Sequence, residues 1–143
     1  MSDTSAATQT PQRDDSAEVT PYDLIGGEAA VRALTDRFYD LMDLEPRFAE
    51  LRAMHPEDMA GARDNLFWFL SGWLGGPQLF VERKGHPMLR RRHMPFSIGE
   101  KERDQWVQCM IQAMEEEGVD DALRTRLAVS FFQTADFMRN REG

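Results

Sequence analysis

The sequence has a single cysteine, fewer basic than acidic residues and no long apolar run, and each of these features argues against a class of protein. Cys109 is the single cysteine in 143 residues. An intramolecular disulfide and a CxxC zinc site are therefore excluded, and a reducing cytoplasm is favoured. No apolar run approaches the ~20 residues of a membrane span, and the N-terminus lacks the basic-then-apolar order of a signal peptide. The net charge of −8 argues against nucleic-acid or anionic-lipid partners.

Residues 1–20 form a segment of different composition from the rest. They are rich in Ser, Thr, Gln and Asp, and Val19 is their only sizeable hydrophobe. Such a segment cannot bury enough apolar surface to offset the entropy lost on ordering. We therefore predict a disordered N-terminal tail over 1–20 and one domain over 21–140.

Helical periodicity dominates that domain. Apolar spacing, capping residues and Gly or Pro stops predict helices over 21–25, over 28–44, from Pro56 to Gly75, from the capping-box pair Ser97 and Glu100 to Gly118, and over 121–140. Between Gln78 and Phe96, where Gly and Pro recur, we expect mostly loop with one two-turn helix over 88–93. No alternating strand pattern occurs, so the predicted fold class is all-α.

Most motifs of enzyme chemistry are missing. The three histidines are not spaced as helical zinc ligands, and HExxH, GxSxG, P-loop and GxGxxG sequences do not occur. Cys109 lies among apolar neighbours in a predicted helix, where a thiol is usually inert packing. These absences weaken the hydrolase, zinc-enzyme and nucleotide-binding alternatives.

The segment GHPMLRRRHMPFSI, residues 85–98, is unusual for a connector because it combines two histidines, three consecutive arginines and large apolar residues. Leu89 and His93 are one helical turn apart and share a face, and Arg92 lies about 100° around the helix. An inward imidazole beside a guanidinium suits a flat apolar ligand bearing carboxylates, such as haem. The alternatives are a hydrogen-bonded core histidine and a solvated basic face.

That segment, followed by RDQW at 103–106, resembles the proximal region of truncated haemoglobins of group II, or O type. Other matching pieces are YDLIGG at 22–27, RFY at 37–39, FL at 69–70 and LGGP at 74–77. The resemblance covers residues 21–140 and implies a globin-like, two-over-two helical sandwich. It also implies haem b as cofactor.

On the proximal side, the resemblance implies that His93 binds the haem iron through one ring nitrogen while the other donates to backbone or solvent. Arg92 would meet a haem propionate. Large apolar residues would form the cofactor-binding walls: Leu66, Phe69, Leu70, Phe80, Met88, Phe96 and Ile98.

On the distal side, the resemblance assigns Tyr39 and Trp106 as hydrogen-bond donors to a bound ligand. Ala62 falls at the gate position and leaves an open route for diatomic molecules. His55 stands where the family usually has Tyr or Phe. It can donate to a ligand, accept from Tyr39, act as a sixth iron ligand, or simply face solvent before Pro56.

The implied function is binding of dioxygen and other small ligands, namely nitric oxide, carbon monoxide or peroxide. Redox turnover, such as nitric oxide dioxygenation or peroxide reduction, would need a partner reductase because the chain has no flavin or nicotinamide motif. A ligand sensor or scavenger without turnover is the alternative, and a haem-free helical interaction module is a third. Both a monomer and a homodimer are compatible with the sequence.

Overall fold

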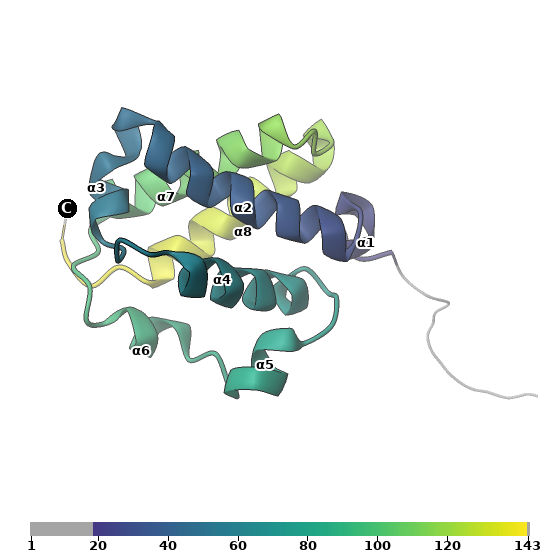
Figure 1. Cartoon of the computed structure of the whole chain (residues 1–143), viewed down its shortest axis with the longest axis horizontal. Helices are drawn as coiled ribbons and strands as arrows, with labels where there is room; N and C mark the ends of the chain where they lie inside the picture. Colours follow the sequence, from purple (N-terminus) through teal and green to yellow (C-terminus); the bar gives the residue numbers. More distant parts are fainter. Residues whose placement is uncertain (1–18, 143) are drawn as a thin grey trace, which may run out of the picture.

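The computed structural model describes residues 19–142, and all regular structure in this part of the chain is helical (Figure 1). The all-α prediction is confirmed. The predicted tail over 1–20 lies, apart from Val19 and Thr20, outside the described residues. The elements are α1 (Pro21–Ile25), α2 (Glu28–Leu44), the 3-10 turn η1 (Pro46–Phe48), α3 (Ala49–Ala53), α4 (Ala60–Trp73), α5 (Leu79–Lys84), α6 (Leu89–His93), α7 (Glu100–Glu116) and α8 (Asp121–Phe137).

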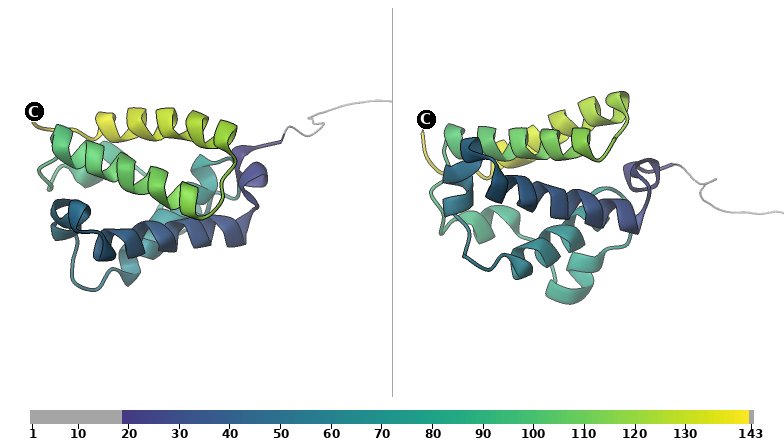
Figure 2. Two further views of the ribbon diagram at one scale, coloured as in Figure 1. Left: turned by 90° about the horizontal axis from the view of Figure 1, so that it is seen from above. Right: turned by 45° about the horizontal axis from the view of Figure 1, so that its top comes forward.

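The four long helices form two packed pairs. α2 packs on α4, α7 packs on α8, and α2 also packs on α7, which joins the pairs. In the view from above, α7 lies between α2 and α8 (Figure 2). The completely buried side chains of this interior include Val31, Leu34, Phe38, Met42, Leu70, Met110 and Met114. This arrangement is the predicted two-over-two helical sandwich.

A glycine-containing turn at the end of α4 holds α1 against the four long helices. The Tyr22 N–H donates to the Leu74 carbonyl at 2.9 Å. Gly75 has a φ of +97°, and a Cβ on Gly76 would lie 2.4 Å from the Tyr22 ring. Glycine is needed at Gly75 for the backbone conformation and at Gly76 for the close ring contact.

Two predicted helix starts are wrong by a few residues. α4 begins at Ala60 rather than at Pro56, because the Asp58 carboxylate accepts the Ala60 N–H at 2.9 Å. A side-chain acceptor at that point satisfies an N–H that has no partner inside the helix. Residues 54–59 therefore form a connector, and His55 lies on that connector.

The start of α7 is also displaced from the predicted capping box. Ser97 and Glu100 do not cap it. The Glu102 carboxylate instead accepts the Gly99 N–H at 2.8 Å, so the helix begins at Glu100. Residues 94–99 therefore form a turn and a loop between α6 and α7.

α5 lies where the sequence predicted loop. Its six residues span Leu79–Lys84 and place Phe80 inward. Six residues are too few to produce a periodic apolar signal, which explains the wrong prediction. α6 matches the short helix predicted over 88–93. None of the helices described here is long and apolar enough to cross a membrane.

Candidate functional site

A cavity of about 430 Å³ lies among α2, the connector before α4, and α4 to α8. Its volume is within the roughly 300–1,000 Å³ of small-molecule sites, and its lining is mostly apolar. The structure brings every predicted site residue except Met88 to this cavity. They are Tyr39, His55, Leu66, Phe69, Leu70, Phe80, Arg92, His93, Phe96, Ile98 and Trp106, together with Ala62.

Met88 is the residue that the structure does not place in the cavity. It has left-handed backbone geometry, with a φ of +46°, and the residue is 49% exposed. The chain turns at this residue into α6, and Leu89 lines the cavity instead. The expected apolar wall at Met88 is therefore corrected to Leu89.

His93, at the end of α6, has one ring nitrogen fixed by the backbone. Its Nδ1 lies 2.7 Å from the Leu89 carbonyl oxygen. A carbonyl only accepts, so Nδ1 carries the proton and Nε2 of the neutral ring keeps its lone pair. The half-buried ring lines the cavity, which makes Nε2 a suitable metal ligand.

Asn140 straps the loop that follows His93. Its Nδ2 donates to the Phe96 carbonyl at 2.7 Å, and its Oδ1 accepts the Ile98 N–H at 3.0 Å. The Asn140 N–H donates in turn to the Ile98 carbonyl at 2.9 Å. Sequence analysis missed this residue, because a lone Asn after a helix gives no sign of a partner 42 residues away.

Arg92 lies at the rim of the cavity. Its side chain is exposed, its Nε donates to the Pro87 carbonyl at 2.6 Å, and its guanidinium lies 5.1 Å from the centre of the Phe80 ring. These contacts hold a positive charge next to an apolar wall. That position suits a carboxylate of a ligand whose body is buried.

His55 lies on the connector between α3 and α4. Its Nδ1 is 3.0 Å from the Leu51 carbonyl, so this ring too is protonated at Nδ1. Burial lowers the pKa of His55, the hydrogen bond to Leu51 opposes that effect, and the charges of Arg52 and His93 lower the pKa further. The neutral ring presents Nε2 as an acceptor or metal ligand rather than as a donor.

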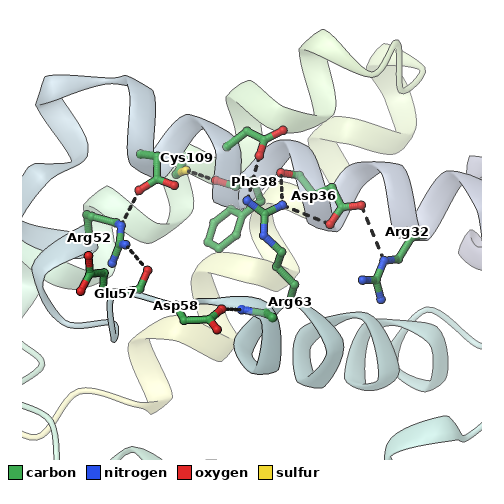
Figure 3. Close-up of polar contacts among 11 residues, drawn as sticks. Arg32, Asp36, Phe38, Arg52, Glu57, Asp58, Arg63 and Cys109 are labelled. Atoms are coloured by element: carbon green, nitrogen blue, oxygen red, sulfur yellow. Dashed lines mark hydrogen bonds and ion pairs between the residues drawn. The ribbon is translucent and has the colours of Figure 1, made fainter.

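Arg52 fixes the connector that carries His55. Its guanidinium donates to three consecutive carbonyls, those of His55 at 3.4 Å, Pro56 at 3.0 Å and Glu57 at 2.9 Å. Its Nε also pairs with the Asp43 carboxylate at the end of α2 (Figure 3). The position of His55 therefore depends on a cation outside the cavity.

Tyr39 and Trp106 supply the hydrogen-bond donors of the site. The two rings of Tyr39 and His55 meet edge to face, with centres 5.8 Å apart. Burial raises the pKa of Tyr39, so its hydroxyl keeps its proton at neutral pH. Within residues 19–142 neither the Tyr39 hydroxyl nor the Trp106 indole N–H has a hydrogen-bond partner, so both can donate to a molecule in the cavity.

Arg63 holds α4 against the helix that carries Tyr39. It pairs with the Asp36 carboxylate at 3.1 Å and the Asp40 carboxylate at 2.8 Å, both on α2 (Figure 3). Its guanidinium also lies 5.7 Å from the centre of the Tyr39 ring. Sequence analysis did not identify this contact, because a charged residue at the start of a helix is usually solvated.

The profile of the bacterial-like globin family matches residues 20–140. A group 2 truncated haemoglobin of Bacillus subtilis is 37% identical over 121 residues, which is 85% of this chain and 89% of the relative. The chain belongs to the group II truncated haemoglobins. The resemblance inferred from the sequence is confirmed, while the role of His55 is a separate question.

Two solved truncated haemoglobins support the membership. The group II protein of Agrobacterium tumefaciens superposes with a TM-score of 0.85 at 45% identity, covering 91% of this chain and all of that one. The structure described as a truncated oxygen-avid haemoglobin from Bacillus subtilis gives a TM-score of 0.78 at 37% identity, covering 85% and 99%. Membership of the globins implies haem and the binding of a small ligand such as oxygen.

The residues of this truncated haemoglobin fit a haem group. An apolar cavity accepts the flat ring, the His93 imidazole has a free nitrogen for iron, and Arg92 at the rim can meet a carboxylate. A bare metal ion fits less well, because no group of three or more His, Cys, Asp or Glu in the described chain could hold one.

Proposed function

We propose that this truncated haemoglobin holds haem b in the cavity, with His93 as proximal iron ligand, and binds dioxygen next to Tyr39, His55 and Trp106. The observation that carries this proposal is the hydrogen bond from His93 Nδ1 to the Leu89 carbonyl. It fixes a lone pair on the nitrogen of a cavity-lining imidazole, which is the donor that a globin needs.

Each part of the cavity has a role in holding the group. The apolar side chains of α4, α5 and the loop after α6 exclude water from the ring. Arg92 orients a propionate, with little contribution to stability because that contact is exposed. Bound haem supplies an iron centre that takes one small ligand and exchanges one electron.

The hydrogen-bond donors on the distal side of the cavity determine which small ligand is favoured. Bound dioxygen carries partial negative charge and accepts hydrogen bonds, whereas carbon monoxide accepts them poorly. The Tyr39 hydroxyl and the Trp106 N–H therefore favour dioxygen. The solved relative described as oxygen-avid supports this proposal.

Haem reconstitution tests the proximal assignment. The purified chain is titrated with haem, and stoichiometry is read from the Soret band, with haem type from the pyridine derivative. We expect one haem b per chain, loss of stable binding in His93→Gly, and recovery when imidazole is added. His86→Ala is the matched control, because His86 is exposed and lies outside the cavity. Unchanged haem retention by His93→Gly would contradict the assignment of His93 as the proximal ligand.

Redox turnover is the second element of the proposal, in addition to ligand binding. Tyr39 and Trp106 can orient a reacting dioxygen or peroxide, and His55 Nε2 can accept a proton from hydrogen peroxide. Nitric oxide dioxygenation and peroxide reduction are the two candidate reactions, and both need electrons from a partner. Nitric oxide consumption that continues over many turnovers with a reductase present would support an enzyme. Consumption that stops after one equivalent would favour the sensor or scavenger instead.

A further inference from the structure

A cationic surface covers the outer side of the cavity wall built by α5 and α6. Residues 81–94 carry five cationic side chains and one acidic one, a net charge of +4 with histidine neutral, in a chain of net charge −8. All five cations are exposed. The α5–α6 surface consists of these cations and three exposed apolar residues, namely Arg83, Lys84, Arg90, Arg91, Arg92, Val81, Met88 and Met94.

No carboxylate in the described part of the chain pairs with the cations of this surface. Within the described residues, none of its five cations lies within 4.0 Å of a carboxylate oxygen, whereas most other cations do. Arg90 donates to backbone carbonyls, which leaves its charge uncompensated, whereas Arg92 is the cation assigned above to a haem propionate. The surface is therefore a local positive field on an acidic protein.

The surface is rich in two residue types that protein interfaces favour. Arg and Met are enriched in such interfaces, and they make up six of its eight residues. Met88 and Met94 flank α6 and are both exposed, and the left-handed backbone at Met88 accompanies its outward position. Long flexible methionines between arginines can adapt to a partner.

We propose that the α5–α6 surface docks an acidic electron-transfer protein that reduces the haem iron. The proposal rests on the haem function above. Phe80, Leu89 and His93 on the inner side of the same segment line the cavity, so a docked partner is separated from the cavity by one layer of chain. One electron passes from the reduced partner, which is thereby oxidised, to ferric iron, which becomes ferrous.

A small acidic protein fits this surface better than an extended polyanion. Outside residues 81–94 the chain has a net charge of −12. A membrane or a nucleic acid would extend over those acidic regions and be repelled. Transient electron-transfer complexes bury less than about 1,200 Å² in total, so such a partner needs only a small area centred on this surface.

Small redox ions of opposite charge test the local electrostatic field at the α5–α6 surface, where the proposal places the entry of electrons. The haem-loaded ferrous protein is oxidised in deoxygenated buffer by ferricyanide or by tris-phenanthroline cobalt(III), from about 0.01 M to about 0.15 M salt. We expect the ferricyanide rate to fall roughly threefold with salt, and the cobalt rate to rise, because the local charge is positive. The opposite pair of slopes, as the net charge of −8 alone would give, overturns the proposal.

Charge-reversal variants locate the field. Lys84→Glu with Arg91→Glu removes four charge units, and neither side chain makes a hydrogen bond or ion pair within residues 19–142. We expect this double variant to lose the ferricyanide salt dependence. Arg126→Glu, an exposed cation on α8 outside the cavity, has the same charge change as each single variant and should retain it. Equal behaviour of Arg91→Glu and Arg126→Glu would contradict the assignment.

Docking itself is measured with reduced flavodoxin, a small acidic flavin protein, as the probe. Titration calorimetry at low salt should show binding that weakens about tenfold in the double variant. No binding by the wild type, equal binding by both proteins, or preference for phosphatidylserine vesicles over flavodoxin overturns the docking proposal. A chain that retains no haem would instead refute the proposed function, while the flavodoxin titration would still report on the surface.

Discussion

His55 and His93 are each held by the same kind of hydrogen bond to the backbone. Each imidazole donates its Nδ1 proton to the carbonyl oxygen four residues earlier, Leu51 at 3.0 Å for His55 and Leu89 at 2.7 Å for His93. Both rings line one cavity, and burial lowers the pKa of His55. Two free Nε2 atoms are thus available to one ligand or metal.

The first prediction concerns the resting state. Because His55 is neutral and its Nε2 has a free lone pair, we expect it to act as sixth ligand in ferric haem-loaded protein without added ligand. Absorption and electron paramagnetic resonance spectra should then be low-spin, and His55→Ala should convert them to high-spin. His86→Ala should not. A high-spin wild type would show that His55 is not an iron ligand in the resting state.

The second prediction concerns dioxygen release. Burial raises the pKa of Tyr39, so its hydroxyl remains a donor at neutral pH. Tyr39→Phe removes a charge-assisted hydrogen bond worth about 1.5–3 kcal/mol, and stopped-flow dissociation should accelerate about tenfold or more. Tyr22→Phe, outside the cavity, is the control. An unchanged rate would assign the hydrogen bond to Trp106.

The third prediction concerns Arg52. Arg52→Ala removes donors from the carbonyls of His55, Pro56 and Glu57, so the connector should open more easily. We expect a loss of about 1–3 kcal/mol in the free energy of unfolding and faster amide exchange at Met54 and His55. Urea unfolding and hydrogen exchange measure the two effects, with Arg126→Ala as the control. Faster exchange throughout the chain, rather than at the connector, would show that Arg52 only contributes general stability.

The site was predictable where local sequence determines geometry. Gly85, Pro87 and Pro95 bound a helix so short that His93 and Leu89 must share its inward face, and the structure brings both to the cavity. The long helices were predictable for the same reason, since their apolar stripes repeat over many turns.

The supporting contacts were not predictable, because they join distant or solvated residues. Asn140 meets Ile98 across 42 residues, and Arg63 meets Asp36 across 27. The carbonyls that Arg52 contacts lie only three to five residues further along the chain. The sequence around such an arginine on a short helix nevertheless looks the same as that around an arginine that faces solvent. Met88 was assigned inward because an apolar residue carries no sign of left-handed backbone.

The fourth prediction concerns the single thiol. Cys109 is fully buried, its Sγ donates to the Phe38 carbonyl at 3.3 Å, and burial raises the pKa of the thiol to about 12. The thiolate is the nucleophile, so iodoacetamide at neutral pH should leave the folded protein unlabelled and should label it rapidly in denaturant. Mass spectrometry reads the adduct. Rapid labelling of the native protein would show that α7 opens far more readily than its burial suggests.

The last prediction concerns acid. Hydrogen bonds from Arg103 and Arg139 lower the pKa of Asp136. Its folded pKa lies below that of the unfolded chain, ~3.9 for Asp, so its stabilising effect is present above that value and is lost as pH falls through the folded pKa. Unfolding midpoints in urea should therefore drop more steeply below about pH 4 for the wild type than for Asp136→Asn. Glu115→Gln is the matched control, because its exposed carboxylate makes no hydrogen bond or ion pair in the described structure. Parallel pH profiles for the wild type and Asp136→Asn would mean that the pairs joining α7 and α8 do not persist in solution.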